Sequence, residues 1–134
     1  MVKGSVVAKL RRLNELLPLI EAGRYRLGPH AARHMLQEGF VEKDVLSALK
    51  WGRELALYPE DERMLVLGYM IFGARLRLPL HVVLEFQKPR WVDIITAFIP
   101  ERPHRVYSRA RLAALLHFDG GREEVQWAFP DAAG

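Results

Sequence analysis

The chain has 134 residues, half of them hydrophobic, which is enough for one folded domain with a single hydrophobic core. It contains no cysteine, which excludes disulfide bonds, thiolate zinc sites and cysteine nucleophiles. The net charge of +4 and the excess of arginine over lysine favour an anionic partner, although many charges and few amides are equally typical of a thermophilic protein. The apolar runs are too short for a transmembrane helix and the N-terminus is too charged for a secretory signal, so we expect a cytoplasmic protein without membrane contact.

The N-terminal segment has the periodicity of an amphipathic helix. Apolar residues recur at intervals of three and four over residues 5–22. Pro18 lies inside this pattern and predicts a kink or an early end near Leu17. A short extended segment follows at residues 24–27.

Two further helices are predicted before the pattern changes. Pro29 is suited to the first turn of a helix over residues 29–38, which Gly39 would end. The sequence from Val41 begins a third helix, and Gly52 follows its end.

The middle of the chain is rich in β-branched, aromatic and leucine residues between short polar connections. Such connections join antiparallel neighbours, so we expect a meander of strands. Ser108 is placed to cap a last helix over residues 109–117, and residues 122–129 could form a short final strand. The expected strands of the meander are residues 54–58, 64–72, 77–87 and 91–99.

One of these strands indicates which sheet face is buried. In strand 77–87, four apolar residues alternate with His81 and its neighbours, so that the two sets point to opposite faces. The apolar set should lie beneath the helices, which leaves His81 on the face that solvent or a ligand can reach. The apolar set is Leu80, Val82, Leu84 and Phe86.

Helices followed by strands predict an α+β fold, with the N-terminal helices packed on a twisted antiparallel sheet and a C-terminal helix after it. We expect one domain over residues 1–134. Within it, residues 1–23 form a helical extension, residues 24–107 the α+β core, and residues 108–134 the last helix and a tail.

A series of short motifs carries a family resemblance. The succession runs from His30-Ala-Ala-Arg33 through Gly39-Phe-Val-Glu-Lys-Asp-Val45 to Leu80-His81-Val-Val and Ile95-Thr-Ala-Phe-Ile-Pro100. In order and spacing these motifs resemble the bacterial domain-of-unknown-function 4258 family over roughly residues 25–107. Gly52, Tyr58-Pro59-Glu-Asp and Gly68 belong to the same succession.

The resemblance implies the RelE-type toxin fold, in which a helical pair packs on a twisted antiparallel sheet. Proteins with that fold cleave messenger RNA, often on the ribosome, and are silenced by an antitoxin. The expected partners are therefore RNA or the ribosome and an antitoxin-like protein. One fold hosts many functions, so the implication is stronger for the fold than for the activity.

The second helix carries a polar stripe with three possible roles. His30, Arg33, His34 and Gln37 share one side, and Ala31, Met35 and Leu36 would form the buried side. The His30 and His34 pair has the spacing of a metal site, but alanine follows His30 where zinc hydrolases have glutamate, so we expect no metal. The helix start could instead hold a phosphate, or His30 could only pin the helix to the neighbouring backbone.

The expected catalytic residues for metal-independent RNA cleavage are His81, His30 and Arg33. Cleavage needs a base, an acid and cations that stabilise the charge of the transition state. The two histidines would form the acid–base pair, Arg33 would stabilise the charge, and no cofactor is required. A structural histidine remains the alternative for His81.

Substrate contacts are expected from aromatic and basic side chains near these residues. Tyr58 and Tyr69 could stack on bases, and the cations could contact phosphates. Arg102 and Arg105 belong to a basic loop between the last strand and the last helix, which a solvated turn would explain almost as well. The candidate cations are Arg75, Arg77, Arg102 and Arg105.

Two functions follow from the sequence. The first is an RNA-acting, ribonuclease-like protein, the toxin of a toxin–antitoxin pair. The alternative is a non-catalytic module that binds a protein or a nucleic acid through a sheet edge or the N-terminal helix, with a homodimer as one form. A buried His81 that is bonded to the backbone would favour this alternative.

Overall fold

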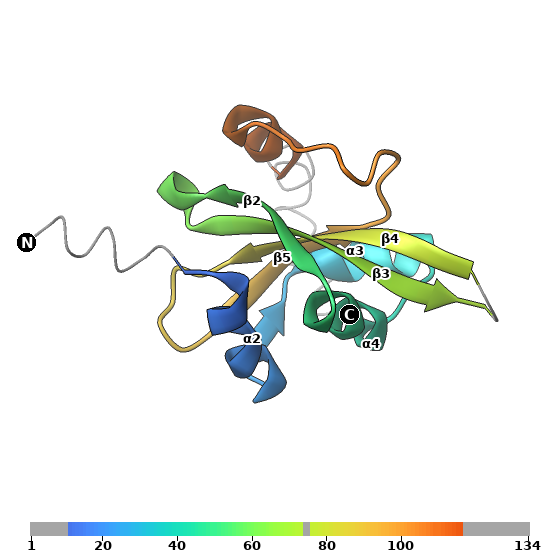
Figure 1. The fold of residues 1–134 in the computed structure, drawn as a ribbon, viewed down its shortest axis with the longest axis horizontal. Helices are drawn as coiled ribbons and strands as arrows, with labels where there is room; N and C mark the ends of the chain where they lie inside the picture. The colour runs from blue at the N-terminus through green and yellow to red at the C-terminus, as the bar shows by residue number, and fades with distance from the viewer. Residues whose placement is uncertain (1–10, 74–75, 117–134) are drawn as a thin grey trace, which may run out of the picture. The chain divides into compact units, whose positions relative to one another are not determined.

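Helices cover one side of a five-stranded sheet in the computed structural model, which describes residues 11–73 and 76–116 (Figure 1). The chain divides into two compact units, residues 1–104 and residues 105–134. The predicted α+β class is confirmed. Across the described ranges, none of the helices has the length and hydropathy that a membrane crossing requires.

Helix α2 (Leu13–Glu21) begins where the backbone N–H of Arg12 donates a hydrogen bond to the Glu15 carboxylate, at 2.8 Å. This bond satisfies one of the donors that a helix start leaves open. The helix continues through Pro18 to Glu21, so the early end expected near Leu17 does not occur.

The start of the predicted helix over residues 5–22 needs correction. Residues 11 and 12 are not helical, so the continuous helix expected there is wrong, and residues 5–10 lie outside the described part of the chain. Glu54 ties the start of α2 to the sheet. It accepts hydrogen bonds from the Arg12 side chain at 2.9 Å and from the Leu13 N–H at 2.8 Å.

The sheet is mixed, not wholly antiparallel as expected. Strand β1 (Tyr25–Leu27) pairs in parallel with strand β5 (Val92–Phe98). The Gly28 N–H continues this pairing by donating to the Ile94 carbonyl oxygen at 2.9 Å. Because β1 has only three residues, it pairs with the first half of β5. The helix that follows β1 lies beside the second half.

Helices α3 (Pro29–Glu38) and α4 (Glu42–Lys50) match their predicted positions. Gly39 ends α3 with a φ of +81°, a conformation that costs glycine little. The N–H of Val41 donates to the Asp44 carboxylate at the start of α4, at 2.9 Å. Leu36, expected on the buried side of α3, is 87% exposed, so that part of the prediction is wrong.

The predicted meander is confirmed. Strands β2 (Arg53–Tyr58), β3 (Arg63–Phe72), β4 (Leu76–Glu85) and β5 pair antiparallel in succession. A short 3₁₀ turn at Pro59–Asp61 joins β2 to β3. The sheet order is β1-β5-β4-β3-β2, which leaves β2 at one edge.

The helix-facing side of the sheet holds the main hydrophobic core, as the alternation in β4 predicted. Three apolar residues of β4, and Phe86 directly after its end, pack there with Ala31, Val45 and Leu49 of the helices. Gly68 of β3 lets α4 approach closely, because a Cβ atom at this position would lie 2.1 Å from the Ala48 carbonyl oxygen. The three residues of β4 are Leu80, Val82 and Leu84.

The second unit holds the predicted C-terminal helix, which the structure describes over residues 109–116. Ser108 caps it as expected. Its Oγ accepts a hydrogen bond from the Arg111 N–H at 3.1 Å, and its carbonyl oxygen accepts one from the Leu112 N–H at 2.9 Å. The short strand proposed at residues 122–129 lies outside the described residues.

Candidate functional site

His81 lies on the sheet face opposite the helices, which we call the outer face. Its neighbours Leu80 and Val82 both belong to the core beneath the helices, so alternation directs His81 the other way. The expectation that solvent can reach His81 on this face is wrong, because the side chain is fully buried. Alternation predicts which face a side chain occupies but not what covers that face.

The imidazole of His81 is held by the backbone. Its Nε2 lies 2.7 Å from the carbonyl oxygen of Pro103, and because a carbonyl oxygen only accepts, Nε2 carries the proton. Burial lowers the pKa of His81, the bond to Pro103 opposes this, and the nearby His104 lowers it further. The ring is therefore neutral at pH 7.

Phe98 connects two histidines. It is the direct cross-strand partner of His81, and the two ring centroids lie 5.5 Å apart in an edge-on arrangement. The ring of His34 on α3 lies 6.0 Å from the same Phe98 ring. The structure thus brings His81 together with His34 through Phe98.

Glu38 fixes the end of α3 against the sheet. Its Oε2 lies 2.9 Å from Nδ1 of His34, one helical turn earlier, and its Oε1 accepts the Ile99 N–H at 2.7 Å. Sequence reasoning missed Glu38, although the spacing of four residues between His34 and Glu38 is a recognised signal for a helical pair.

The other two predicted catalytic residues lie on α3. His30 is buried, beside the core residue Ala31, and Arg33 is partly exposed. The helix thus presents His30 on its buried side, whereas His81 points to the outer face.

The outer face opens to solvent near the end of the β3–β4 hairpin. Tyr69, Ile71 and Arg77 are exposed there, and we call these three residues the outer patch. Ile71 and Arg77 are direct cross-strand partners, and the Arg77 guanidinium lies 4.7 Å from the centre of the Tyr69 ring. Figure 1 shows the hairpin end reaching past helix α4.

The remaining predicted contacts are distributed unevenly. Tyr58 is buried at the end of β2, and Arg75 lies outside the described residues. Arg102 is exposed on the connection after β5. In the second unit, the Arg105 guanidinium lies 5.9 Å from the Tyr107 ring. Of the predicted contact residues, Tyr69 and Arg77 are the two that the structure shows together.

Within residues 11–73 and 76–116, no three histidine or carboxylate side chains are grouped so that they could hold a metal ion. His34, one of the two candidate ligands, has Glu38 at its Nδ1 atom.

An ion-pair cluster that sequence reasoning did not find joins the parallel strands. Asp93 of β5 accepts hydrogen bonds from Arg26 of β1 at 2.9 Å and from Lys88 at 3.2 Å. Burial alone would raise the pKa of Asp93, but the bonds from Arg26 and Lys88 outweigh it and hold this pKa below its usual range. Arg26 and Asp93 are register partners, so this cluster depends on a long-range pairing that no local motif announces.

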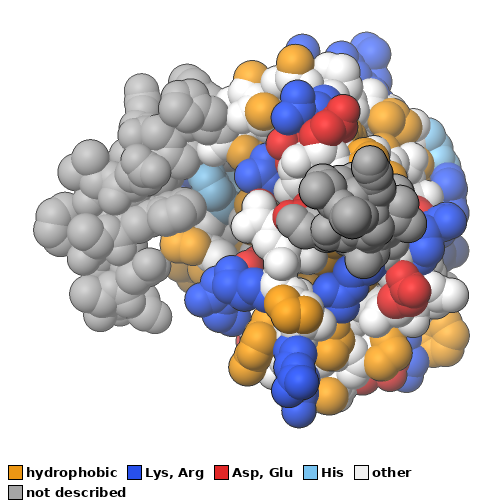
Figure 2. Space-filling model, turned by 90° about the vertical axis from the view of Figure 1, so that its left-hand side faces the viewer, with side chains coloured by type: hydrophobic (Ala, Val, Ile, Leu, Met, Phe, Trp, Pro, Cys, Tyr) orange, Lys and Arg blue, Asp and Glu red, His pale blue; other side chains and the backbone are white. Residues whose placement is uncertain are grey.

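Figure 2 shows how the basic side chains are distributed on one face of the molecule. On the face drawn in Figure 2, Lys and Arg side chains lie scattered among hydrophobic ones. The described residues form no extended basic groove on this face of the kind that tracks a nucleic-acid backbone.

Comparison with known proteins gives one match. The family model described as "Domain of unknown function (DUF4258)" matches residues 27–99, which is more than half of the chain. The match runs from the last residue of β1 to just past β5 and includes the outer patch, but it leaves out α2. No curated protein and no solved structure matches the chain.

Proposed function

This chain belongs to the DUF4258 family, and on that premise we propose that it is an RNA-binding module that contacts single-stranded RNA through the outer patch. The proposal assigns Tyr69 to stacking on a base and Arg77 to a neighbouring phosphate. His81 supports the sheet at the buried end of the same outer face and takes no part in chemistry.

The observation that carries the proposal is the exposed pair of Arg77 and Tyr69 on the outer face. Single-stranded nucleic acids are bound by aromatic rings that stack on bases and by cations that contact the backbone. Here both groups come from adjacent strands, so the sheet itself fixes their spacing. The basic net charge of the chain supports an anionic ligand.

The environment of His81 supports binding over catalysis. A general acid or base must reach the substrate within hydrogen-bond distance, directly or through one water. The His81 ring is buried, and its Nε2–H is donated to Pro103. A neutral imidazole packed against Phe98 is suited to support the sheet.

RNA cleavage by a RelE-type toxin is the second candidate function. The observation in its favour is the chain order, in which a helical pair, α3 and α4, is followed by a four-stranded meander that it covers. This agrees with the arrangement that the family resemblance implies. In this version His81, His30 and Arg33 would act on the RNA, and an antitoxin-like protein would silence the activity.

Binding of a fluorescein-labelled single-stranded RNA, followed by anisotropy over a salt series, tests the proposal. We expect Tyr69→Ala to weaken binding by about tenfold, because one stacked base contributes roughly 1–3 kcal/mol. Arg77→Ala should reduce the slope of log affinity against log salt concentration by the amount that about one phosphate contact contributes. Arg90→Ala is the matched control, since Arg90 is also exposed but lies on the loop before β5.

Equal binding by wild type, Tyr69→Ala and Arg77→Ala would refute the outer patch as the RNA site. Mapping RNA ends after induced expression distinguishes the second candidate. New ends with wild type that are lost with folded His81→Gln would establish cleavage that uses this histidine, whereas binding without new ends supports the module.

A further inference from the structure

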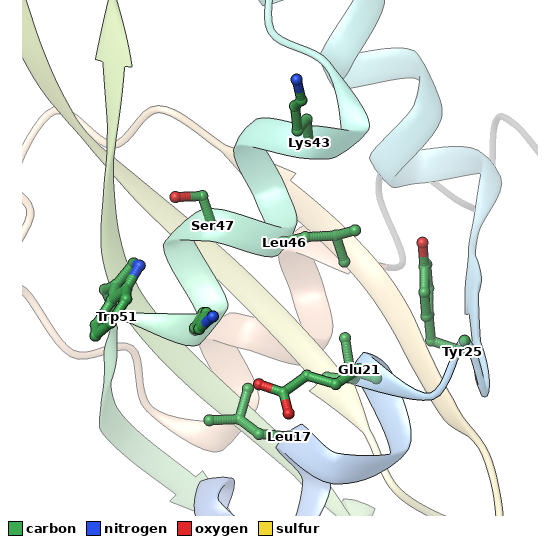
Figure 3. Close-up of a pocket in the computed structure, with 10 residues that line it drawn as sticks. Leu17, Glu21, Tyr25, Lys43, Leu46, Ser47 and Trp51 are labelled. Atoms are coloured by element: carbon green, nitrogen blue, oxygen red, sulfur yellow. The ribbon is translucent and has the colours of Figure 1, made fainter.

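A second surface of the first unit lies on the helix side of the sheet. A hollow of about 660 Å³ is bounded by α2, β1 and α4 (Figure 3). A neighbouring hollow of about 520 Å³ lies between α2 and the start of β2, and both are lined by Leu17. Because both hollows are lined by Leu17 of α2, we call them together the α2 groove.

The groove has an apolar floor and an aromatic rim. Leu17 of α2 and Leu46 of α4 line it, and Figure 3 shows Leu46 pointing from α4 toward Tyr25 on β1. Trp51, at the end of α4, also lines the hollow and is 78% exposed. An exposed tryptophan beside a hollow is typical of residues that dominate binding energy in protein interfaces.

The cations that line the larger hollow are lysines on one helix. Lys43 and Lys50 lie seven residues apart on α4, which places them two turns or about 10.5 Å apart along the helix axis. Ser47 lies between them on the same stripe. Glu21 on α2 is the carboxylate that lines this hollow.

Tyr25 stabilises the wall opposite α4. Its hydroxyl donates to the Glu42 carboxylate at the start of α4, and this bond, together with burial, raises the pKa of Tyr25 to about 12. The phenol therefore stays protonated, and Glu42 is engaged with it. Its bond to Tyr25 joins β1 to α4 and fixes the width of the hollow.

We propose that the α2 groove binds an acidic, extended peptide segment of a partner protein, with carboxylates near Lys43 and Lys50 and an apolar side chain between Leu17 and Leu46. In a polyproline II segment, which has three residues per turn and rises about 3.1 Å per residue, residues three apart lie on the same side about 9 Å apart, close to the separation of the two lysines. A surface of two neighbouring hollows suits a peptide better than a compact small molecule. Its apolar floor and the presence of Glu21 distinguish it from a nucleic-acid surface.

This surface is separate from the outer patch, because α2 and α4 cover the opposite side of the sheet. Part of it is contributed by α2, which the family match does not include. Part of the groove therefore lies outside the matched range, and the proposal does not depend on RNA binding.

Selection from a displayed library of random heptapeptides on the immobilised full-length protein tests the proposal. We expect the selected peptides to carry acidic residues at a spacing of three with an apolar residue between them. A variant with Trp91→Phe and Trp127→Phe leaves Trp51 as the single tryptophan, and its emission should shift to shorter wavelength as a synthetic copy of the best peptide binds.

Charge reversal then locates the site. Lys43→Glu and Lys50→Glu should each weaken binding by about tenfold or more, whereas Glu21→Gln should strengthen it by a few-fold because a repulsive carboxylate is removed. A gain of affinity cannot arise from misfolding. Arg90→Glu reverses the same charge outside the groove and should change affinity by less than about twofold.

Recovery of no peptide, or of peptides without acidic residues, would overturn the proposal, as would full affinity in both lysine variants. Sedimentation over a concentration range tests a second copy as the occupant. Dimerisation that Lys50→Glu abolishes would replace the peptide with another copy of this chain.

Discussion

The two faces of the sheet are built from the same strands yet differ in the substitutions that they tolerate. Beneath the helices, β3 and β4 present buried apolar side chains, and Gly68 lies against the backbone of α4. On the outer face the same strands change along their length, from buried His81 to exposed Tyr69 and Arg77. The difference indicates that the helix side determines stability, whereas the outer face has a part that is free to contact a ligand.

The largest expected effect is on the helix side. Gly68→Ala should destabilise the protein by about 3 kcal/mol or more, because its Cβ would lie 2.1 Å from the Ala48 carbonyl oxygen and α4 would have to move. Urea unfolding measures this change in the free energy of unfolding. Gly73→Ala is the control. That turn has a φ of +68° and open space for a Cβ, so the cost should be only about 1–2 kcal/mol. Equal losses of stability at both glycines would show that the close approach of α4 to Gly68 does not make the helix side more sensitive.

A smaller effect is expected at the buried end of the outer face, and it depends on pH. The folded protein holds His81 neutral, whereas the unfolded chain titrates near the ordinary pKa of 6.5. Below pH 6.5 the unfolded state therefore binds a proton that the folded state excludes, so stability falls as the pH falls, by at most about 1.4 kcal/mol per pH unit from this residue.

His81→Gln keeps a donor for Pro103 and cannot titrate. Between pH 7 and pH 5.5 we expect the free energy of unfolding of this variant to decrease less than that of the wild type. Urea unfolding at each pH measures the difference. The other four histidines are common to both proteins, so the difference between the two pH profiles belongs to His81. Parallel profiles would show that His81 titrates in the fold as it does when unfolded.

The smallest effect on stability is expected at the exposed end of the outer face. Tyr69→Ala and Arg77→Ala should each change the free energy of unfolding by less than about 0.5 kcal/mol, because exposed positions contribute little packing. The same variants should weaken RNA binding, which separates a ligand contact from a structural one. A large loss of stability in either variant would mean that the outer patch supports the fold.

Much of the fold could be predicted from the sequence because its signals are local. The alternation in β4 identified the helix-facing residues, and Pro29 and Gly39 marked the ends of α3. The parallel pairing of β1 could not be predicted, since three residues carry no pattern that specifies a partner. Leu36 is exposed although its spacing suited the buried side, because α3 buries His30 and Ala31 instead.

The candidate site was predicted only in part, for a related reason. Tyr69 and Arg77 were named separately, and the register between β3 and β4 brings them together. The burial of His81 and its bond to Pro103 depend on the path of the chain after β5, which local periodicity does not report. Cross-strand register and the covering of a face are tertiary properties, so they must be observed.

The pairing of β1 with β5 also has a consequence for the order of folding. Arg26 and Asp93 are 67 residues apart in sequence, and strands β2, β3 and β4 are all synthesised between them. The meander can form from neighbouring hairpins with little loss of chain entropy, but the first strand must wait for the last one before it has a partner. During synthesis on the ribosome, strand β1 and helix α3 therefore lack the strand that they pack against until β5 has emerged, and the sheet becomes complete in a single late step.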